Sequence, residues 1–151
     1  MIEVLKYQNN LQNDWDQFVD ISDNGTLFQK QKFLSYHIDR VFEDCSLIFK
    51  KRGKIIAVFP AALKGEKENK ILFSHPGASF GGLVYQDLSF EDCNIIIRLI
   101  EGVAHKKKCR EIFLIQTPSI YNKYHHEDLI DYCLKENCYN NDEIYLSSIL
   151  S

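Results

Sequence analysis

The chain has 151 residues, of which 45% are hydrophobic and 13% aromatic. A chain of this length can bury one core and is too short for two, so we expect a single domain spanning residues 1–151. The formal net charge of −3 argues against general nucleic-acid binding, which depends on a basic excess, so DNA is not an expected partner. No apolar run approaches a transmembrane segment in length, and the N-terminus lacks the basic and apolar regions of a signal peptide, which predicts a cytoplasmic protein.

Hydrophobic periodicity and turn signals predict the secondary structure in chain order. The predicted elements are a strand at 2–7, a helix at 11–19, a helix opened by a Thr26–Gln29 capping box and running to 41, strands at 45–50, 55–63 and 70–74, a short strand at 83–85, a helix at 89–103, a strand at 111–116, a helix at 128–137 and a strand at 143–150. The short strand at 83–85 is either separate or the continuation of the strand before it.

This order combines an antiparallel meander with a strand-helix-strand crossover. The turn at 51–54 favours a hairpin between its neighbouring strands, and the unbroken apolar run at 112–115 is typical of a central strand covered on both faces. The fold class predicted is α/β (α+β), with the order β-α-α-β-β-β-α-β-α-β, a mixed sheet and helices on both of its faces.

The segment 74–82 (Ser-His-Pro-Gly-Ala-Ser-Phe-Gly-Gly) holds three of the seven glycines and one of the three prolines. Glycine permits positive φ and close backbone approach, and Pro76 biases His75 away from helix, which predicts a shaped loop. Backbone N–H groups and small hydroxyls on such a loop can face a ligand.

The five cysteines are odd in number and form no CxxC pair, and no four-ligand spacing of histidine and cysteine is present. We therefore predict reduced structural thiols and no metal site.

The element order resembles the GNAT fold of N-acyltransferases, and three segments sharpen the resemblance. They are Trp15 and Phe18 followed by residues 24–29 (Asn-Gly-Thr-Leu-Phe-Gln), the glycine loop at 74–82, and residues 118–121 (Pro-Ser-Ile-Tyr). Together they are similar to the N-terminal half of FemAB-like (peptidoglycan bridge-type) acyl and aminoacyl transferases, in which two GNAT-like domains lie in tandem. The resemblance covers nearly the whole chain.

The resemblance implies direct attack of an amine on an acyl donor, without a covalent enzyme intermediate. The donor would be acetyl-CoA or another acyl-CoA, or an aminoacyl-tRNA. In GNAT proteins the coenzyme A pyrophosphate lies on a glycine- and arginine-containing loop at the start of the helix that follows the fourth strand. Here that place is residues 85–92, which contain no glycine, no basic residue and three carboxylates, so we expect poor coenzyme A binding and predict no firm cofactor.

His75 is the predicted catalytic residue, as general base for the amine, and the alternative is that its ring braces the loop through a hydrogen bond to backbone. Tyr121 follows the predicted central strand, where open α/β sheets tend to bind ligands, and either orients a substrate or packs over the core. The predicted substrate-binding residues are Gln29, His37, Ser79, Phe80, Gly81, Ser119 and Tyr121.

Three functions follow as hypotheses. The first is a FemAB-like acceptor-binding half that acts on amines of cell-envelope precursors or surface sugars, with a small amine, sugar or peptide as acceptor. The second is a complete small acetyl-CoA-dependent N-acetyltransferase, as a monomer or a dimer, and the third is a non-enzymatic interaction module. The edge of the last predicted strand, at 143–150, would pair with a second GNAT-like domain or with a second copy as a homodimer. The chain would be a reduced single-domain relative, a truncated frame or one piece of a split protein.

Overall fold

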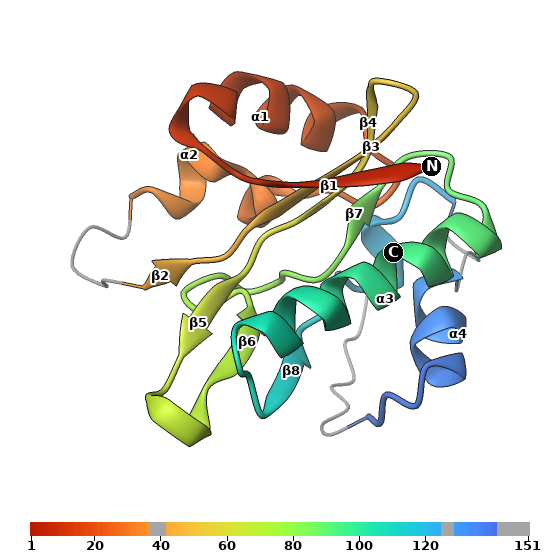
Figure 1. Ribbon diagram of the computed structural model, residues 1–151. Helices are drawn as coiled ribbons and strands as arrows, with labels where there is room; N and C mark the ends of the chain where they lie inside the picture. The colour runs from red at the N-terminus through yellow and green to blue at the C-terminus, as the bar shows by residue number, and fades with distance from the viewer. Residues whose placement is uncertain (37–41, 125–128, 142–151) are drawn as a thin grey trace.

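The computed structural model describes residues 1–36, 42–124 and 129–141 (Figure 1). The strands are β1 (Ile2–Lys6), β2 (Glu43–Asp44), β3 (Leu47–Lys51), β4 (Lys54–Phe59), β5 (Ala62–Lys64), β6 (Ile71–Ser74), β7 (Val84–Tyr85) and β8 (Glu111–Leu114). The α-helices are α1 (Gln12–Ile21), α2 (Gln31–Leu34), α3 (Phe90–Lys106) and α4 (Leu129–Glu136), with short 3-10 turns at Asn9–Leu11, Leu27–Gln29, Lys67–Asn69 and Ser119–Tyr121.

The described strands form two four-stranded sheets, in the orders β1-β3-β4-β7 and β2-β5-β6-β8. All pairs are antiparallel except β6 with β8, which run parallel and are joined through α3. The predicted hairpin is present as β3 and β4, and the predicted crossover as β6-α3-β8. The mixed α+β fold class is therefore confirmed.

Helices cover both faces of the strands, as the sequence predicted. Figure 1 shows α1 and α2 on one side and α3 and α4 on the other. The larger hydrophobic cluster packs α3 and α4 against one face of the strands, and a smaller cluster around Trp15 and Phe18 packs α1 against the opposite face. Successive strand residues therefore pack into opposite cores. Ile48 and Val58 lie in the smaller core under α1, and Phe49 and Phe59 lie in the larger core under α3 and α4.

The strand predicted at 55–63 is two strands in different sheets. β4 ends at Phe59 and β5 begins at Ala62. Pro60 lies at the break, and because proline has no N–H it cannot donate to a continuing ladder. The same division falls between β6, which pairs with β5, and β7, which pairs with β4. The glycine loop at 74–82 begins at the end of β6 and leads to β7, at the point where the sheets separate.

The second predicted helix also differs from expectation. The Thr26–Gln29 capping box exists, but it closes the 3-10 turn Leu27–Gln29, and Lys30 is extended with a ψ of 136°. α2 begins afresh at Gln31, because the Asp16 carboxylate of α1 accepts hydrogen bonds from the backbone N–H groups of Gln31 and Lys32. The remainder of the predicted helix reaches residues 37–41, outside the described residues.

β8 is shorter than the predicted strand and its apolar side chains are half-buried rather than covered on both faces. Among the described strands it stands last in its sheet, beside β6 alone. The predicted strand at 143–150, with its proposed pairing edge, lies outside the described residues. None of the helices that the structure describes is long and apolar enough to cross a membrane.

Candidate functional site

The glycine loop is held closed by Ser74, the last residue of β6. Its buried hydroxyl donates to the carbonyl of Pro60 and accepts from the N–H of Gly82 at 2.8 Å. The N–H of Gly81 donates to Ile115 O at 2.8 Å, which fixes the loop to the segment after β8. Gly77 and Gly82 have φ values of 88° and 74°, the left-handed region that favours glycine. The loop is thus a fixed part of the scaffold, held where the two sheets separate.

His75 follows this anchor through a cis peptide bond and is only 8% exposed. Its Nδ1 lies 2.7 Å from the carbonyl oxygen of Pro76. In the neutral ring this contact selects the tautomer with the proton on Nδ1, which leaves the lone pair on Nε2. Phe42 packs edge-on against the ring at a centroid distance of 6.3 Å. Both predicted roles of His75, brace and base, are compatible with this tautomer.

His75 lines a pocket of about 270 Å³ on the side of the strands that carries α1 and α2. We call it the Gln31 pocket, after a residue on its wall. The lining comes from the ends of β1 and β2, the start of α1, α2 and the glycine loop: Tyr7, Asn9, Gln12, Gln31, Leu34, Ser35, Phe42, Asp44, Ala62 and His75. Most of these side chains carry a polar group, so the pocket suits a polar ligand.

Carboxylates set the electrostatics of the Gln31 pocket. Burial raises the pKa of the Tyr7 hydroxyl, and the nearby carboxylates of Asp16 and Asp44 raise it further. Partial desolvation by the surrounding protein raises the pKa of the Asp44 carboxyl group, although Asp44 stays accessible to solvent. Hydrogen bonds from Ser46 and the positive charge of Lys6 oppose the shift. The field of these carboxylates favours a cation over an anion in the pocket.

Gln29, a predicted substrate-binding residue, is fully buried beside the glycine loop. Its Nε2 donates to Gly81 O at 3.1 Å and to Thr117 Oγ1 at 2.6 Å, and its Oε1 accepts from the N–H and the hydroxyl of Thr26. The structure thus brings together Gln29 and Gly81, two of the predicted site residues. Both polar ends of the Gln29 amide are engaged by protein groups.

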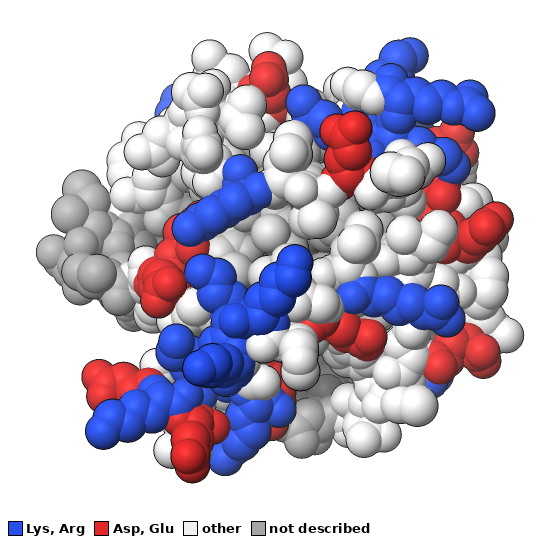
Figure 2. Space-filling model, viewed as in Figure 1, with Lys and Arg blue, Asp and Glu red and all other residues white. Residues whose placement is uncertain are grey.

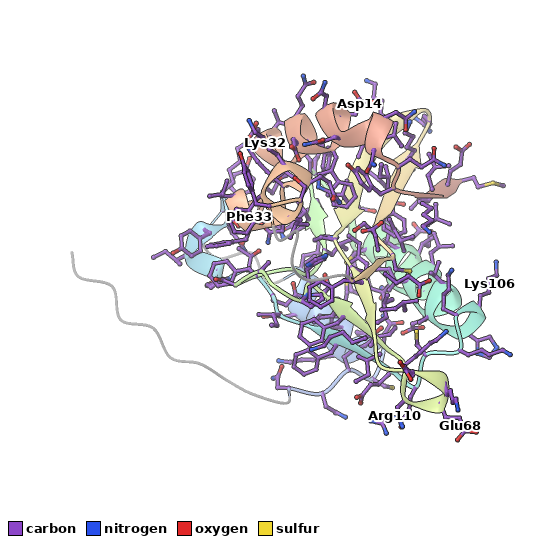
Figure 3. All side chains as sticks on the ribbon, turned by 90° about the vertical axis from the view of Figure 1, so that its left-hand side faces the viewer. Asp14, Lys32, Phe33, Glu68, Lys106 and Arg110 are labelled. Atoms are coloured by element: carbon purple, nitrogen blue, oxygen red, sulfur yellow. The ribbon has the colours of Figure 1, made fainter. Side chains whose placement is uncertain are left out.

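Phe80 and Tyr121, also predicted to bind substrate, lie in contact at a ring-centroid distance of 5.7 Å. Phe28 packs edge-on against Phe80, and Phe33 against Phe28, each at 5.3 Å. Tyr121 is 56% exposed, so this row of rings reaches the surface. Figure 3 shows Phe33 on α2, far from Glu68 and Arg110 at the other end of the molecule.

The two predicted serines, Ser79 and Ser119, are exposed near these rings, in the glycine loop and at the start of the turn Ser119–Tyr121. His37, the remaining predicted site residue, lies outside the described residues.

The start of α3, where the resemblance places a cofactor pyrophosphate, is occupied by the protein's own groups. Ser89 caps the helix by accepting from the N–H of Asp92 at 3.1 Å. The Asp92 carboxylate binds Lys51 Nζ with both oxygens, at 3.0 and 2.7 Å. The N–H of Asp87 donates to an Asp23 carboxylate oxygen at 2.8 Å. Figure 2 shows acidic side chains among basic ones on the right of the molecule, where α3 begins.

Asp23 and Asn24, which the sequence analysis did not assign to the site, close the edge of β7 that no described strand pairs. The Asn24 amide donates to Leu83 O at 2.8 Å and accepts from the N–H of Tyr85 at 2.9 Å. The N–H of Asp23 donates to Tyr85 O at 2.8 Å. A side chain and a loop thus take the hydrogen-bonding groups that a neighbouring strand or an extended ligand would use.

Gln31 and Asp44 were also missed. Gln31 sits within the predicted second helix and Asp44 directly before a predicted strand, and neither belongs to a recognisable motif. Only the fold, which brings α2, β2 and the glycine loop together, reveals them as neighbours in one pocket.

Comparison with solved structures gives the class of fold. The aminoglycoside N-acetyltransferase AAC(6')-Iy, in complex with a bisubstrate analog, aligns with a TM-score of 0.61 and 13% identity over 100% of this chain and 99% of its own. AAC(6')-Ih from Acinetobacter baumannii aligns with a TM-score of 0.56 and 10% identity over the whole of both chains.

FemX aligns with a TM-score of 0.53 and 16% identity, over 71% of this chain and 25% of its own. No family model matches the sequence, and no curated protein matches it. At these identities the likeness establishes the fold: the chain has the fold of GNAT acetyltransferases.

Proposed function

We propose that this domain is the acceptor-binding half of a FemAB-like acyl or aminoacyl transferase. It acts on amines of cell-envelope precursors or surface sugars, and it binds coenzyme A poorly. The observation that carries the proposal is the set of hydrogen bonds at the start of α3. There the Ser89 hydroxyl accepts from the N–H of Asp92, and the Asp92 carboxylate accepts from Lys51 Nζ. A pyrophosphate there would meet a carboxylate in place of a free donor, and would have to displace the Lys51–Asp92 pair.

In this proposal the acceptor lies beside the glycine loop. The neutral amine nitrogen attacks the carbonyl carbon of the acyl donor and loses one proton, and the donor's sulfur or oxygen leaves as a thiolate or alkoxide that is protonated afterwards. His75 Nε2 accepts that proton, since the contact of Nδ1 with Pro76 O keeps the lone pair on Nε2. Ser79, Phe80, Ser119 and Tyr121 would contact the outer part of the acceptor, and a second GNAT-like domain would hold the donor.

A complete small N-acetyltransferase is the second candidate function. One observation favours it: the chain aligns with 99% of the length of AAC(6')-Iy, whereas it aligns with only 25% of FemX. This candidate predicts that the isolated protein binds acetyl-CoA and releases free thiol with an amine substrate, and that His75→Ala loses this activity.

A thermal-shift comparison separates the two functions. The acceptor-half proposal predicts no shift with coenzyme A or acetyl-CoA and a concentration-dependent rise with an amino sugar nucleotide or a peptide precursor. A rise that saturates with coenzyme A at one equivalent overturns it in favour of the second candidate.

A further inference from the structure

The side chain of Gln31 carries a buried hydrogen-bond donor that the protein does not use. Gln31 is 7% exposed, and its Nε2 has no hydrogen-bond partner among the described residues. An amide donor left unpaired in a protein interior costs free energy, so such groups are rare unless a ligand pairs with them. Gln31 also lines the pocket that contains His75, so the residue that carries this unpaired donor forms part of the pocket wall.

Asp44 supplies the opposite chemistry to the same pocket. Its Oδ1 accepts from the hydroxyl of Ser46 at 2.7 Å, which orients the carboxylate. Among the described residues no lysine or arginine lies within 4 Å of this carboxylate, although the positive charge of Lys6 acts on it from farther away. The side chain is accessible to solvent at the exposed strand β2. An oriented carboxylate of this kind pairs well with a ligand ammonium group, through charge-assisted hydrogen bonds.

We propose that the Gln31 pocket recognises amino alcohols and amino sugars, with the ligand's ammonium group on the Asp44 carboxylate and a neighbouring hydroxyl or ether oxygen on Gln31 Nε2. That this ligand is the amine acceptor of the reaction rests on the proposed function. Its binding to the pocket requires no acyl donor. The volume of about 270 Å³ lies just below the ~300 Å³ at which sites for drug-sized ligands begin. The pocket therefore takes one sugar ring or one end of a larger acceptor.

Gln31 and Asp44 are then specificity-determining residues with separable roles. Asp44 selects for the positive charge, and Gln31 selects for the oxygen beside it. A ligand that lacks either group leaves one protein group unpaired, which is an effective way to reject an analogue. The anionic surroundings of Tyr7, near Asp16 and Asp44, act in the same direction against anionic ligands.

The test is a calorimetric titration of the full chain at pH 7 with three probes: D-glucosamine, D-glucose and cyclohexylamine. Glucosamine has both groups, glucose only the oxygens, and cyclohexylamine only the ammonium. The expected result is saturable binding of glucosamine, with glucose and cyclohexylamine each at least about tenfold weaker, as expected for the loss of one hydrogen bond to a charged or buried group. Absence of glucosamine binding, or equal binding of glucose, overturns the inference.

Two variants assign the contacts. Asp44→Asn should weaken glucosamine about tenfold or more and remove its advantage over glucose, while Glu68→Gln, an equal change of charge on the turn Lys67–Asn69, should leave binding unchanged. Gln31→Met keeps the length of the side chain and removes the unpaired donor. It should weaken glucosamine toward the affinity of cyclohexylamine without lowering Tm, and Gln17→Met, on the exposed face of α1, serves as its control.

Glucosamine binding by Gln31→Met distinguishes a recognition role of Gln31 from a purely structural one. If Gln31→Met binds glucosamine like the wild-type chain, Gln31 has no role in recognition and the inference is wrong. Because no acyl donor is present, these measurements stand apart from the proposed function. Coenzyme A binding would overturn the acceptor-half proposal and leave the pocket's selectivity intact. Loss of glucosamine selectivity without coenzyme A binding would overturn the pocket inference and leave the acceptor-half proposal standing.

Discussion

Asn24 provides the sharpest test of how the edge of β7 is closed. Its amide donates to Leu83 O at 2.8 Å and accepts from the N–H of Tyr85 at 2.9 Å, and Asn24 is only 4% exposed. Asn24→Ala removes both bonds and leaves a buried carbonyl and a buried N–H without these partners. At ~1–3 kcal/mol for each buried group left unsatisfied, we predict a loss of about 2–6 kcal/mol in the free energy of unfolding.

Asn24→Asp sharpens the same prediction because it changes one atom. The variant keeps the oxygen that accepts from Tyr85 but sets a second oxygen against the carbonyl oxygen of Leu83. It should be destabilised at pH 7 and should recover part of the loss in acid, where a protonated carboxyl can donate to Leu83 again. Urea unfolding measures the free energies, with Asn13→Ala and Asn13→Asp on the exposed face of α1 as controls. If Asn24→Ala loses no more stability than Asn13→Ala, the assigned role of Asn24 is refuted.

The remaining predictions concern the pocket, the loop and the thiols. The raised pKa of Asp44 means that its ionisation is less favourable in the folded than in the unfolded chain, so Asp44 lowers stability above its folded pKa. Asp44→Asn should therefore raise Tm at pH 7, with the gain vanishing as pH falls below 3.8; an equal gain at pH 3 would contradict this. Gly81→Ala places a Cβ against the backbone of Ser74 and His75 and should cost at least ~1–3 kcal/mol. Gly102→Ala, at an exposed position in the C-terminal half of α3, should gain ~0.5–1 kcal/mol. Urea unfolding that ranks the two variants the other way would refute the packing argument. Iodoacetamide should modify exposed Cys138 first and leave Cys45, Cys93 and Cys133 unmodified until the protein unfolds. These three thiols are buried, and desolvation raises their pKa. Mass spectrometry identifies the modified sites, and early labelling of Cys93 would contradict the packing of α3 on α4.

Much of the fold could be predicted because its signals are local. The hairpin of β3 and β4, the Ser89 cap of α3 and the apolar stripe of that helix depend on residues a few positions apart. The capping box at Thr26 was also read correctly as a hydrogen-bond pattern. It was wrong as the start of a long helix, because the residue that starts α2 is Asp16, on another helix.

The candidate site was less predictable, since its groups come from distant segments. Sequence reasoning identified the loop with His75, and the aromatic contact of Phe80 with Tyr121 brings two of its chosen residues together. Gln31 and Asp44 could not be predicted from the sequence. An unpaired buried donor such as Gln31 Nε2 is recognised only when every neighbouring acceptor is known, and Asp44 joins the same pocket only through the fold. The role of Asn24 could not be predicted either, because its hydrogen-bond partners at 83 and 85 lie about sixty positions along the chain.

In the proposed function, this GNAT-fold domain binds an acceptor amine and not the coenzyme A donor. The most direct measurement is an amide-resolved NMR titration of the isotope-labelled chain, first with coenzyme A and then with glucosamine. Coenzyme A should leave the N–H signals of Asp92 and Cys93 at the start of α3 unmoved. Glucosamine should shift the signals of the Gln31 side-chain amide. Saturable shifts at the start of α3 with coenzyme A, and none at Gln31 with glucosamine, would contradict the proposed function.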